Sequence, residues 1–161
     1  MQKSSYDKIN LFDVNLNKNE KYLESKNYMA GKKLVVSDLL WGKLGMSICY
    51  DLRFPNLYRK LTKKGAQFFS IPAAFTFTTG KAHWHSLIRA RAIENGCFVF
   101  APAQCGVHDN GRRTYGHSMI VNPWGKILVE AKKNKKQIIS TIINIDEIGH
   151  SRKKIPSMTQ F

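Results

Sequence analysis

The chain has 161 residues, is 43% hydrophobic and carries a formal net charge of +15. This length can bury one core, so we expect a single domain over residues 1–161. No apolar stretch approaches the roughly 20 residues that a membrane-spanning helix needs, and residues 1–10 lack the apolar segment of a signal peptide. We therefore expect a cytoplasmic protein with no membrane partner.

The basic excess is large, with 26 lysine and arginine residues against 11 aspartate and glutamate residues. Such a balance can indicate nucleic-acid binding. The basic residues are scattered, however, and the densest run, at residues 132–136, joins two apolar segments as a solvated hairpin loop would. We therefore do not expect nucleic acid as a partner, although a basic protein that interacts with nucleic acid stays open as an alternative.

The opening part of the chain is polar, with a short apolar patch at residues 9–14. Further along, residues 34–36 and 44–48 have the composition of strands, and the turn between them falls at residues 41–43. We predict that these two strands are neighbours in a sheet.

The next segment, residues 55–64, is predicted to form a helix. Pro55 suits the first helical position, and Gly65 ends the helical spacing of apolar residues. The apolar run 68–71 follows as another strand. A strand–helix–strand unit of this kind implies a parallel pair of strands.

A second helix is predicted over residues 82–95, where apolar residues share one face and Asn95-Gly96 ends the pattern. It leads into a strand at residues 97–101. Residues 102–115 then form a long predicted loop, and loops of this length often carry function.

The last predicted elements are strand-like. Residues 118–121 and 127–129 flank a turn and are expected to pair, and residues 138–145 form a further apolar run that we predict to be a strand. Taken together, the elements predict an α/β protein with a mixed sheet.

Cys49 follows the apolar run 45–48 and precedes the helix predicted at Pro55. A cysteine where a strand ends and a helix begins is exposed at the carboxyl edge of a sheet, and the helix dipole favours its thiolate. We therefore predict that Cys49 is a nucleophile and that the chain is an enzyme or part of one. A buried structural cysteine is the alternative.

The other two cysteines lack this context. Cys97 opens an apolar run and is predicted to lie in the core, whereas Cys105 lies in a glycine-containing loop and could line a site. Three cysteines without paired spacing do not indicate a disulfide framework, which favours a reducing compartment.

The histidines provide no clear metal site or relay. His83 and His85 are two residues apart on a predicted helix and point to different faces. His108 lies near Cys105 but lacks a second Cys or His pair. We therefore expect no metal and no cofactor. A Cys–His pair, as in acyltransferases and peptidases, stays open as a different mechanism.

Six motifs, read together, are more specific than any one of them. In chain order they lie at residues 6–13, 24–25, 49–55, 82–84, 89–95 and 115–118. The set resembles the nitrilase (carbon–nitrogen hydrolase) superfamily, and most closely its branch of deaminated-glutathione and omega-amidases. The resemblance covers essentially the whole chain. It implies part of a four-layer α-β-β-α sandwich, in which two sheets pack face to face with helices outside.

The resemblance also assigns roles to residues. Cys49 matches the nucleophile, Lys8 matches the catalytic lysine, and Glu24 matches a second glutamate that supports this lysine and the substrate geometry. The Lys8 ammonium and the backbone N–H of Tyr50 would stabilise the oxyanion that forms on the substrate. The same ammonium would favour the Cys49 thiolate.

Several other side chains are expected around this centre. Asp51 and Arg53 should fix the turn at Cys49 through ion pairing, and Arg91 and Glu94, three apart on a helix, should form a structural pair. The substrate pocket at the sheet's carboxyl edge is expected to be shaped by Ala74, Phe75 and Thr79.

The resemblance further implies a general-base glutamate well upstream of Lys8, yet only seven residues precede Lys8 and none is glutamate. We therefore expect a truncated domain that lacks the opening strands, their helices and the base. Its expected function is hydrolysis of carbon–nitrogen bonds in small carboxylate-bearing amides through a thioester, with no activity unless the chain is complemented. Expected partners are the amide substrate and either further copies of the chain or a complementing N-terminal fragment. An inactive remnant and half of a split enzyme are the alternatives.

Overall fold

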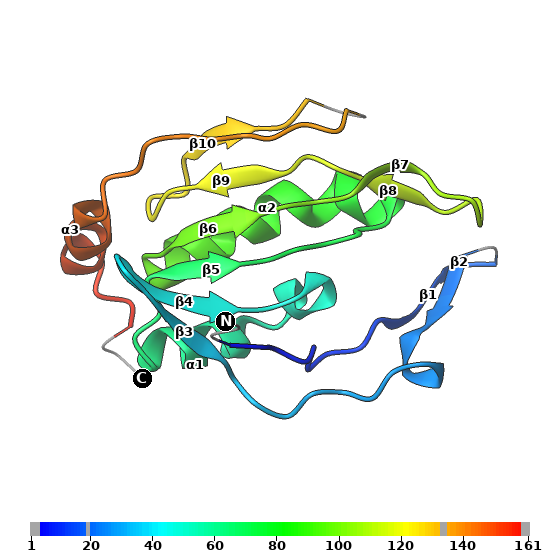
Figure 1. Cartoon of the computed structure of the whole chain (residues 1–161), viewed down its shortest axis with the longest axis horizontal. Coiled ribbons are helices and arrows are strands. Elements are labelled where there is room, and N and C mark those ends of the chain that lie inside the picture. The colour runs from blue at the N-terminus through cyan, green and yellow to red at the C-terminus, as the bar shows by residue number, and fades with distance from the viewer. Residues whose placement is uncertain (1–3, 19, 133–134, 159–161) are drawn as a thin grey trace.

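The computed structural model describes residues 4–18, 20–132 and 135–158, so Lys133 and Asn134 of the basic run lie outside the described residues. Its main element is a mixed sheet of six strands in the order β10-β9-β6-β5-β4-β3 (Figure 1). The predicted α/β class with a mixed sheet is confirmed. The strands are β3 (Val36–Leu39), β4 (Gly42–Met46), β5 (Phe68–Ser70), β6 (Phe98–Ala101), β9 (Met119–Val121) and β10 (Ile127–Glu130).

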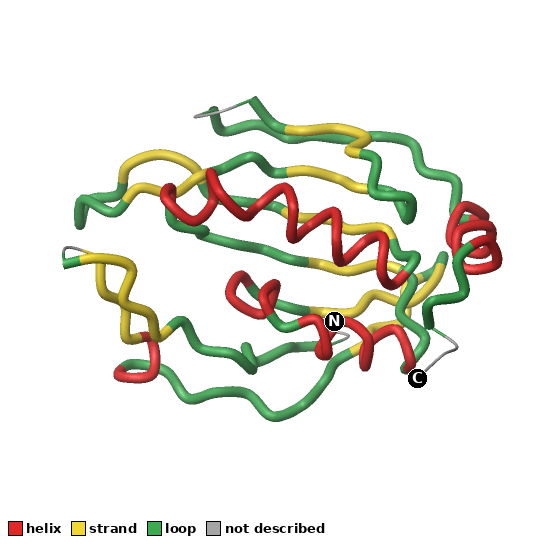
Figure 2. Tube along the Cα trace, turned by 180° about the vertical axis from the view of Figure 1, so that it is seen from behind, coloured by secondary structure: helices red, strands yellow, loops and turns green. Residues whose placement is uncertain are grey.

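Three parallel strands form the centre of this sheet. Gly45, Phe69 and Val99 lie side by side on β4, β5 and β6. The helices α1 (Pro55–Lys63) and α2 (Phe77–Asn95) connect these strands and cover the same face of the sheet (Figure 2). The predicted strand–helix–strand unit is therefore confirmed. Because the carboxyl ends of the three strands meet at one edge, the segments that follow them lie together.

The start of α2 differs from the prediction, which placed it at residue 82. Thr76 caps the helix by accepting a hydrogen bond from the Thr79 backbone N–H at 3.4 Å, and threonine is a preferred N-cap residue. The first turn is rich in threonine and glycine and therefore lacks the apolar spacing that located the rest of the helix. At the other end Gly96 is left-handed, with φ of 55°, as expected for a helix-ending glycine.

Two hairpins lie in segments whose sequence did not indicate strands. One occupies the polar opening segment. The other lies within residues 102–115, so the prediction that these residues form a loop throughout is wrong. Both consist of short antiparallel strands, and the first leads into a 3-10 helix, η1 (Glu24–Lys26). The strands are β1 (Asp13–Asn17), β2 (Glu20–Leu23), β7 (Cys105–Val107) and β8 (Arg113–Tyr115).

The prediction of a strand at residues 138–145 is wrong. The run is rich in isoleucine, but no described strand forms a ladder with it, and Ile138 and Ile142 are each 97% exposed. A helix that was not predicted follows, α3 (Asp146–Lys154). Its acidic first turn and basic last turn match the helix dipole.

Different elements pack against the two faces of the sheet. On the helix side, Trp84 of α2 packs in the main core with Phe69 and Val99. On the other face, Phe68 and Phe98 stack at 6.0 Å between ring centroids and contact Ile148 of α3. Neither α1 nor α2 lies over this second face (Figure 1), where further apolar side chains are only half-buried. Within the described residues no helix is long and apolar enough to cross a bilayer.

Candidate active site

Cys49 lies just beyond β4, as the first residue of a 3-10 helix, η2 (Cys49–Arg53), that leads to α1. Its φ is 48°, a left-handed conformation that non-glycine residues rarely adopt. Its backbone N–H donates to the Pro72 carbonyl, in the segment after β5, at 2.9 Å. The chain therefore bends sharply at the carboxyl edge of the sheet, which is where the sequence placed this cysteine.

Asp51 braces this bend. Its fully buried carboxylate accepts hydrogen bonds from the Ile48 backbone N–H at 2.9 Å, from the Tyr6 hydroxyl at 2.7 Å, and from the backbone and side-chain nitrogens of Asn10 at 2.9 and 2.8 Å. Burial, and secondly the bond to Asp51, raises the pKa of Tyr6 far above its ordinary value. One carboxylate thus ties the opening segment to the cysteine bend.

The expected ion pair between Asp51 and Arg53 is not formed. The Arg53 guanidinium instead lies 3.3 Å from His83 Nδ1 and 5.1 Å from the centre of the Phe75 ring. The reason is that the nearby N–H and O–H donors already satisfy the Asp51 carboxylate. The expected pair of Arg91 and Glu94 is present, at 2.9 Å.

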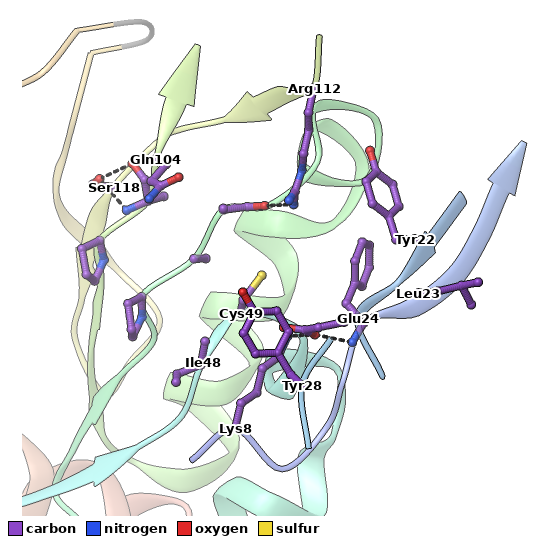
Figure 3. A pocket seen from close by; sticks show the side chains of 16 residues that line it. Lys8, Tyr22, Leu23, Glu24, Tyr28, Ile48, Cys49, Gln104, Arg112 and Ser118 are labelled. Carbon is purple, nitrogen blue, oxygen red and sulfur yellow. Dashed lines mark hydrogen bonds and ion pairs between the residues drawn. The ribbon is translucent and has the colours of Figure 1, made fainter. Parts of the chain in front are cut away.

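Lys8 and Glu24 form an ion pair at 2.5 Å. Glu24 also accepts a hydrogen bond from the Phe12 backbone N–H at 2.5 Å, which fixes its position relative to the opening segment. Both side chains line the same cavity as Cys49, although they lie 41 and 25 positions before it in the sequence. The structure therefore brings together the three residues proposed as catalytic (Figure 3).

The cavity has a volume of about 800 Å³ and lies where the segments after β4, β5 and β6 meet. Its wall includes Tyr22 and Tyr28 from the opening segment and Gln104 and Ser118 from the far side. No histidine among the described residues lines it, although all five histidines of the chain are described. This geometry does not support the Cys–His alternative.

Burial raises the pKa of the Cys49 thiol. A backbone hydrogen bond from Ala74 and the charges of Lys8 and Arg112 act in the opposite direction but do not overcome the burial. This direction is opposite to the predicted preference for the thiolate at Cys49. The local reason is that a 3-10 turn, rather than the start of α1, follows the cysteine.

Arg112 lines the cavity although its sequence context did not indicate a functional residue. It lies between β7 and β8 and reaches toward the Cys49 end of the cavity (Figure 3), where its Nη2 donates to the Ala74 carbonyl at 2.5 Å. Its guanidinium lies 5.1 Å from the centre of the Tyr22 ring. Among the described residues, Arg112 Nε is the one buried side-chain nitrogen or oxygen without a hydrogen-bond partner. No signal in the sequence distinguished it from Arg113 beside it.

The three residues predicted to shape the pocket occupy different places. Ala74 lines the main cavity and also a much smaller adjoining pocket, whereas Phe75 and Thr79 line only the smaller one. Thr79 is buried and its hydroxyl pairs with Thr76 at 2.7 Å. Contact of Phe75 or Thr79 with a substrate thus stays a prediction. The backbone N–H of Tyr50, predicted as an oxyanion donor, belongs to η2 directly after Cys49.

The remaining cysteines differ from Cys49 in surroundings. Cys97 is fully buried in the core, as predicted, and burial raises the pKa of its thiol. Cys105 is half-buried in β7 and lines a separate cavity with His117. Within the described part of the chain, the side chains that could hold a metal ion are His85, His117 and Glu130.

Comparison with known proteins gives consistent results. Residues 2–153 match the carbon–nitrogen hydrolase family. The deaminated glutathione amidase of Synechocystis sp. is 49% identical over 155 residues, which is 95% of this chain and 57% of that protein. The crystal structure of the C. elegans NitFhit protein superposes with a TM-score of 0.88 at 39% identity, over 99% of this chain and 39% of that one.

An amidase from Nesterenkonia sp. AN1 is also similar, with a TM-score of 0.68 and 28% identity over 80% of this chain and 47% of that one. The structure compared is that of a mutant of this amidase, and it carries acrylamide, joined by Michael addition at the active-site cysteine. The chain described here spans about half the length of the curated relatives it matches.

Proposed function

The chain belongs to the carbon–nitrogen hydrolase family, and on that premise we propose that it carries the nucleophile of an amidase that cleaves small carboxylate-bearing amides through a thioester. The observation that supports this most is the shared cavity. The sharply bent Cys49, the Lys8–Glu24 pair and the Arg112 guanidinium all face it, although they come from separate parts of the chain.

In the proposed reaction the Cys49 sulfur attacks the amide carbonyl carbon while its proton passes to a base. The C–S bond forms and the carbonyl oxygen becomes an oxyanion. The Lys8 ammonium and the Tyr50 backbone N–H stabilise this charge, because preorganised donors are most effective where charge develops. The intermediate then collapses, the C–N bond breaks, and the departing nitrogen takes the proton as ammonia. Water finally attacks the thioester, giving the carboxylic acid and restoring the thiol.

The base is the open step of this scheme. Glu24 is the carboxylate that lines the described cavity, and its Oε2 accepts hydrogen bonds from both Lys8 and the Phe12 backbone N–H. A carboxylate held this way orients the lysine and is poorly placed to take a proton from sulfur. We therefore assign Glu24 as a positioning residue. The general base then comes from an acidic side chain on a segment that packs over the cavity, in the same polypeptide or in a separate one.

The half-covered face of the sheet is an argument for such a covering segment. Leu44, Phe100 and Leu128 are only partly buried there, beside the buried Phe68 and Phe98. Burying apolar surface contributes roughly 25 cal/mol per Å², so a layer over this face would stabilise the fold. In the full assembly we expect that layer and the base to belong to the same covering polypeptide. Assembly of several copies of this chain is the alternative partner arrangement.

Arg112 supports the choice of substrate class. A buried guanidinium nitrogen without a partner is costly, and a carboxylate is the group that guanidinium pairs with most strongly. The aromatic ring of Tyr22 fixes one face of the guanidinium, so the planar group is preorganised toward the cavity. We therefore propose that Arg112 binds the substrate carboxylate while Cys49 attacks the amide at the other end.

The test measures ammonia release from succinamate, with neutral butyramide as the matched substrate that lacks the carboxylate. The chain is assayed alone and together with the part of the Synechocystis relative that it does not span. We expect turnover only in the combined sample. Arg112→Gln should raise the KM for succinamate at least about 10-fold and leave butyramide unchanged, whereas Arg113→Gln should change neither. Equal loss on both substrates would overturn the role of Arg112.

The nucleophile is tested separately with acrylamide, followed by mass spectrometry of the modified peptide. Alkylation of Cys49 in the native chain should slow in Lys8→Ala, because the ammonium lowers the pKa of the thiol. Substitution of each histidine in turn should have no such effect. If a histidine variant instead abolishes alkylation and Lys8→Ala does not, the Cys–His mechanism replaces the one proposed here.

A further inference from the structure

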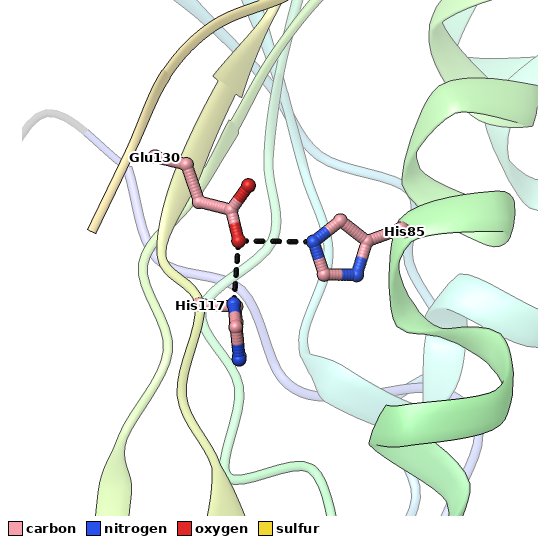
Figure 4. A group of neighbouring side chains, drawn as sticks. All are labelled: His85, His117 and Glu130. Carbon is pink, nitrogen blue, oxygen red and sulfur yellow. Dashed lines mark hydrogen bonds and ion pairs between the residues drawn. The ribbon is translucent and has the colours of Figure 1, made fainter. Parts of the chain in front are cut away.

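A second group of side chains converges away from the Cys49 cavity. Glu130 Oε1 lies 3.0 Å from His85 Nε2 and 2.5 Å from His117 Nδ1 (Figure 4). His85 comes from α2, His117 from the segment between β8 and β9, and Glu130 from β10. The candidate donor atoms all lie within 4.8 Å of one another. Three distant segments thus direct their donor atoms at one point.

The surrounding contacts fix the two imidazoles. The Tyr115 ring stacks on His117 with 4.3 Å between ring centroids, and it meets His85 edge-on at 6.0 Å. His117 has a left-handed backbone, with φ of 59°, and its carbonyl accepts a hydrogen bond from Trp84 Nε1 at 2.9 Å. The rings are therefore held in place by packing and by the backbone. Preorganised ligands reduce the entropy that binding would otherwise cost.

Burial alone would raise the pKa of Glu130, but hydrogen bonds from His117 and His85 hold it below its ordinary value. A carboxylate and two imidazoles form a donor set suited to a transition metal ion.

We propose that His85, His117 and Glu130 form a binding site for Zn²⁺ or a similar divalent transition metal. Two imidazole nitrogens and one carboxylate oxygen are a known donor set for zinc with an open coordination position. The side chains remain 34%, 18% and 30% exposed respectively, so an ion can enter from solvent. Bond lengths near 2.1 Å require only small side-chain movements from the present hydrogen-bonded arrangement.

A bound ion would connect the edge strand to the body of the protein. It would link β10 with α2 and with the segment between β8 and β9 that holds His117. The next residue, Ser118, bonds to Ala103 and lines the Cys49 cavity. Occupancy would therefore fix one wall of that cavity. The site does not depend on the proposed amidase activity, because none of its three ligands lines the Cys49 cavity.

The experiment uses untagged protein in which Cys49 and Cys105 are replaced by serine, so that accessible thiols do not bind metal. Calorimetric titration with Zn²⁺, and visible absorption with Co²⁺, should both give one saturable equivalent. Loss of an outer-shell partner alone typically weakens metal binding 10–100-fold. Removal of a direct ligand, in His117→Gln or Glu130→Gln, should therefore weaken it at least about 10-fold. His85→Glu keeps three donors and should remain within about 10-fold of the parent.

Two controls separate this site from general histidine binding. His83→Gln and His108→Gln should bind Zn²⁺ as the parent does, because neither side chain belongs to the group. Should the ligand variants fail to fold, the parent protein still decides the matter: Zn²⁺ should raise its melting temperature and Mg²⁺ should not. Failure to saturate with Zn²⁺, or binding equally tight in Glu130→Gln and the parent, would show a hydrogen-bonded cluster only.

Discussion

Replacing Asp51 with asparagine keeps the shape of the side chain but removes its charge and one acceptor oxygen. In the native protein one carboxylate oxygen accepts from both nitrogens of Asn10, and the other accepts from Tyr6 and the Ile48 backbone N–H. If the new amide nitrogen faces Tyr6, the phenol can rotate and accept from it. The Ile48 N–H is then left without a partner in a buried site.

The magnitude of this change follows from these contacts. An orphaned buried donor costs about 1–3 kcal/mol, and the bonds that remain lose the strength that the charge gave them. We expect Asp51→Asn to lower the free energy of unfolding by about 2–4 kcal/mol. That loss is large against the 5–15 kcal/mol or so of a typical domain.

Urea unfolding followed by tryptophan fluorescence measures the change, and an unaltered m-value would show that the unfolded state is unaffected. Asp38→Asn is the matched control, because Asp38 is an exposed partner of Lys43 and should change stability by about 0.5 kcal/mol or less. In a double-mutant cycle, Asp51→Asn and Tyr6→Phe should be non-additive, since they remove a shared bond. Asp51→Asn as stable as the parent would refute the bracing role.

Three further predictions concern packing at a glycine, the reactivity of the thiols, and stability at high pH. Gly80→Ala should lower the free energy of unfolding in urea by about 1–3 kcal/mol, because a Cβ there would lie 2.3 Å from Tyr115 Cβ. Gly149→Ala is the control: a Cβ there meets nothing within 4 Å, so this variant should not be destabilised. In native protein iodoacetamide should modify Cys105 and Cys49 before the fully buried Cys97, and equal rates by peptide mass spectrometry would contradict the burial seen here. Burial raises the pKa values of Tyr58 and Cys97. Their contribution to stability is therefore fully present at pH values below the ordinary pKa values of thiols and phenols. It is lost as the pH rises through those values and toward the raised ones. Unfolding free energies measured at pH 7.5 and 10.5 should show this decline, and Tyr58→Phe should reduce it.

The sequence predicted what depends on local order along the chain. The parallel unit of β4, α1 and β5 was predictable because an apolar run, a proline-started helix and a second run follow one another within a short span. The place of Cys49 at the strand end followed from the same order. Lys8 and Glu24 were found only through the resemblance of whole motifs, because neither residue has a local pattern that distinguishes it from a surface charge.

What the sequence did not predict depends on contacts between distant segments. Glu130, His85 and His117 meet only once β10 is paired and α2 is packed, and the spacing of His85 from its neighbour His83 gave no hint of this. The prediction of a strand at residues 138–145 was wrong for a related reason, since isoleucine favours a strand only where another strand is available to pair. Arg112 was missed because its place in the cavity is set by the short β7–β8 hairpin, which the sequence presented as a loop.

Asp51 also connects stability with chemistry. It holds the Ile48 N–H beside Cys49, and through Tyr6 and Asn10 it holds the opening segment on either side of Lys8. The conformation of the cysteine bend and the position of the ammonium are therefore set by the same carboxylate. A perturbation that frees the opening segment should move the Lys8 ammonium away from Cys49, even if the sheet stays folded. The pKa of the thiol would then lose the lowering effect of this charge. Native alkylation of Cys49 in Asp51→Asn should accordingly slow by at least as much as in Lys8→Ala, and a faster reaction would show that the two are not coupled.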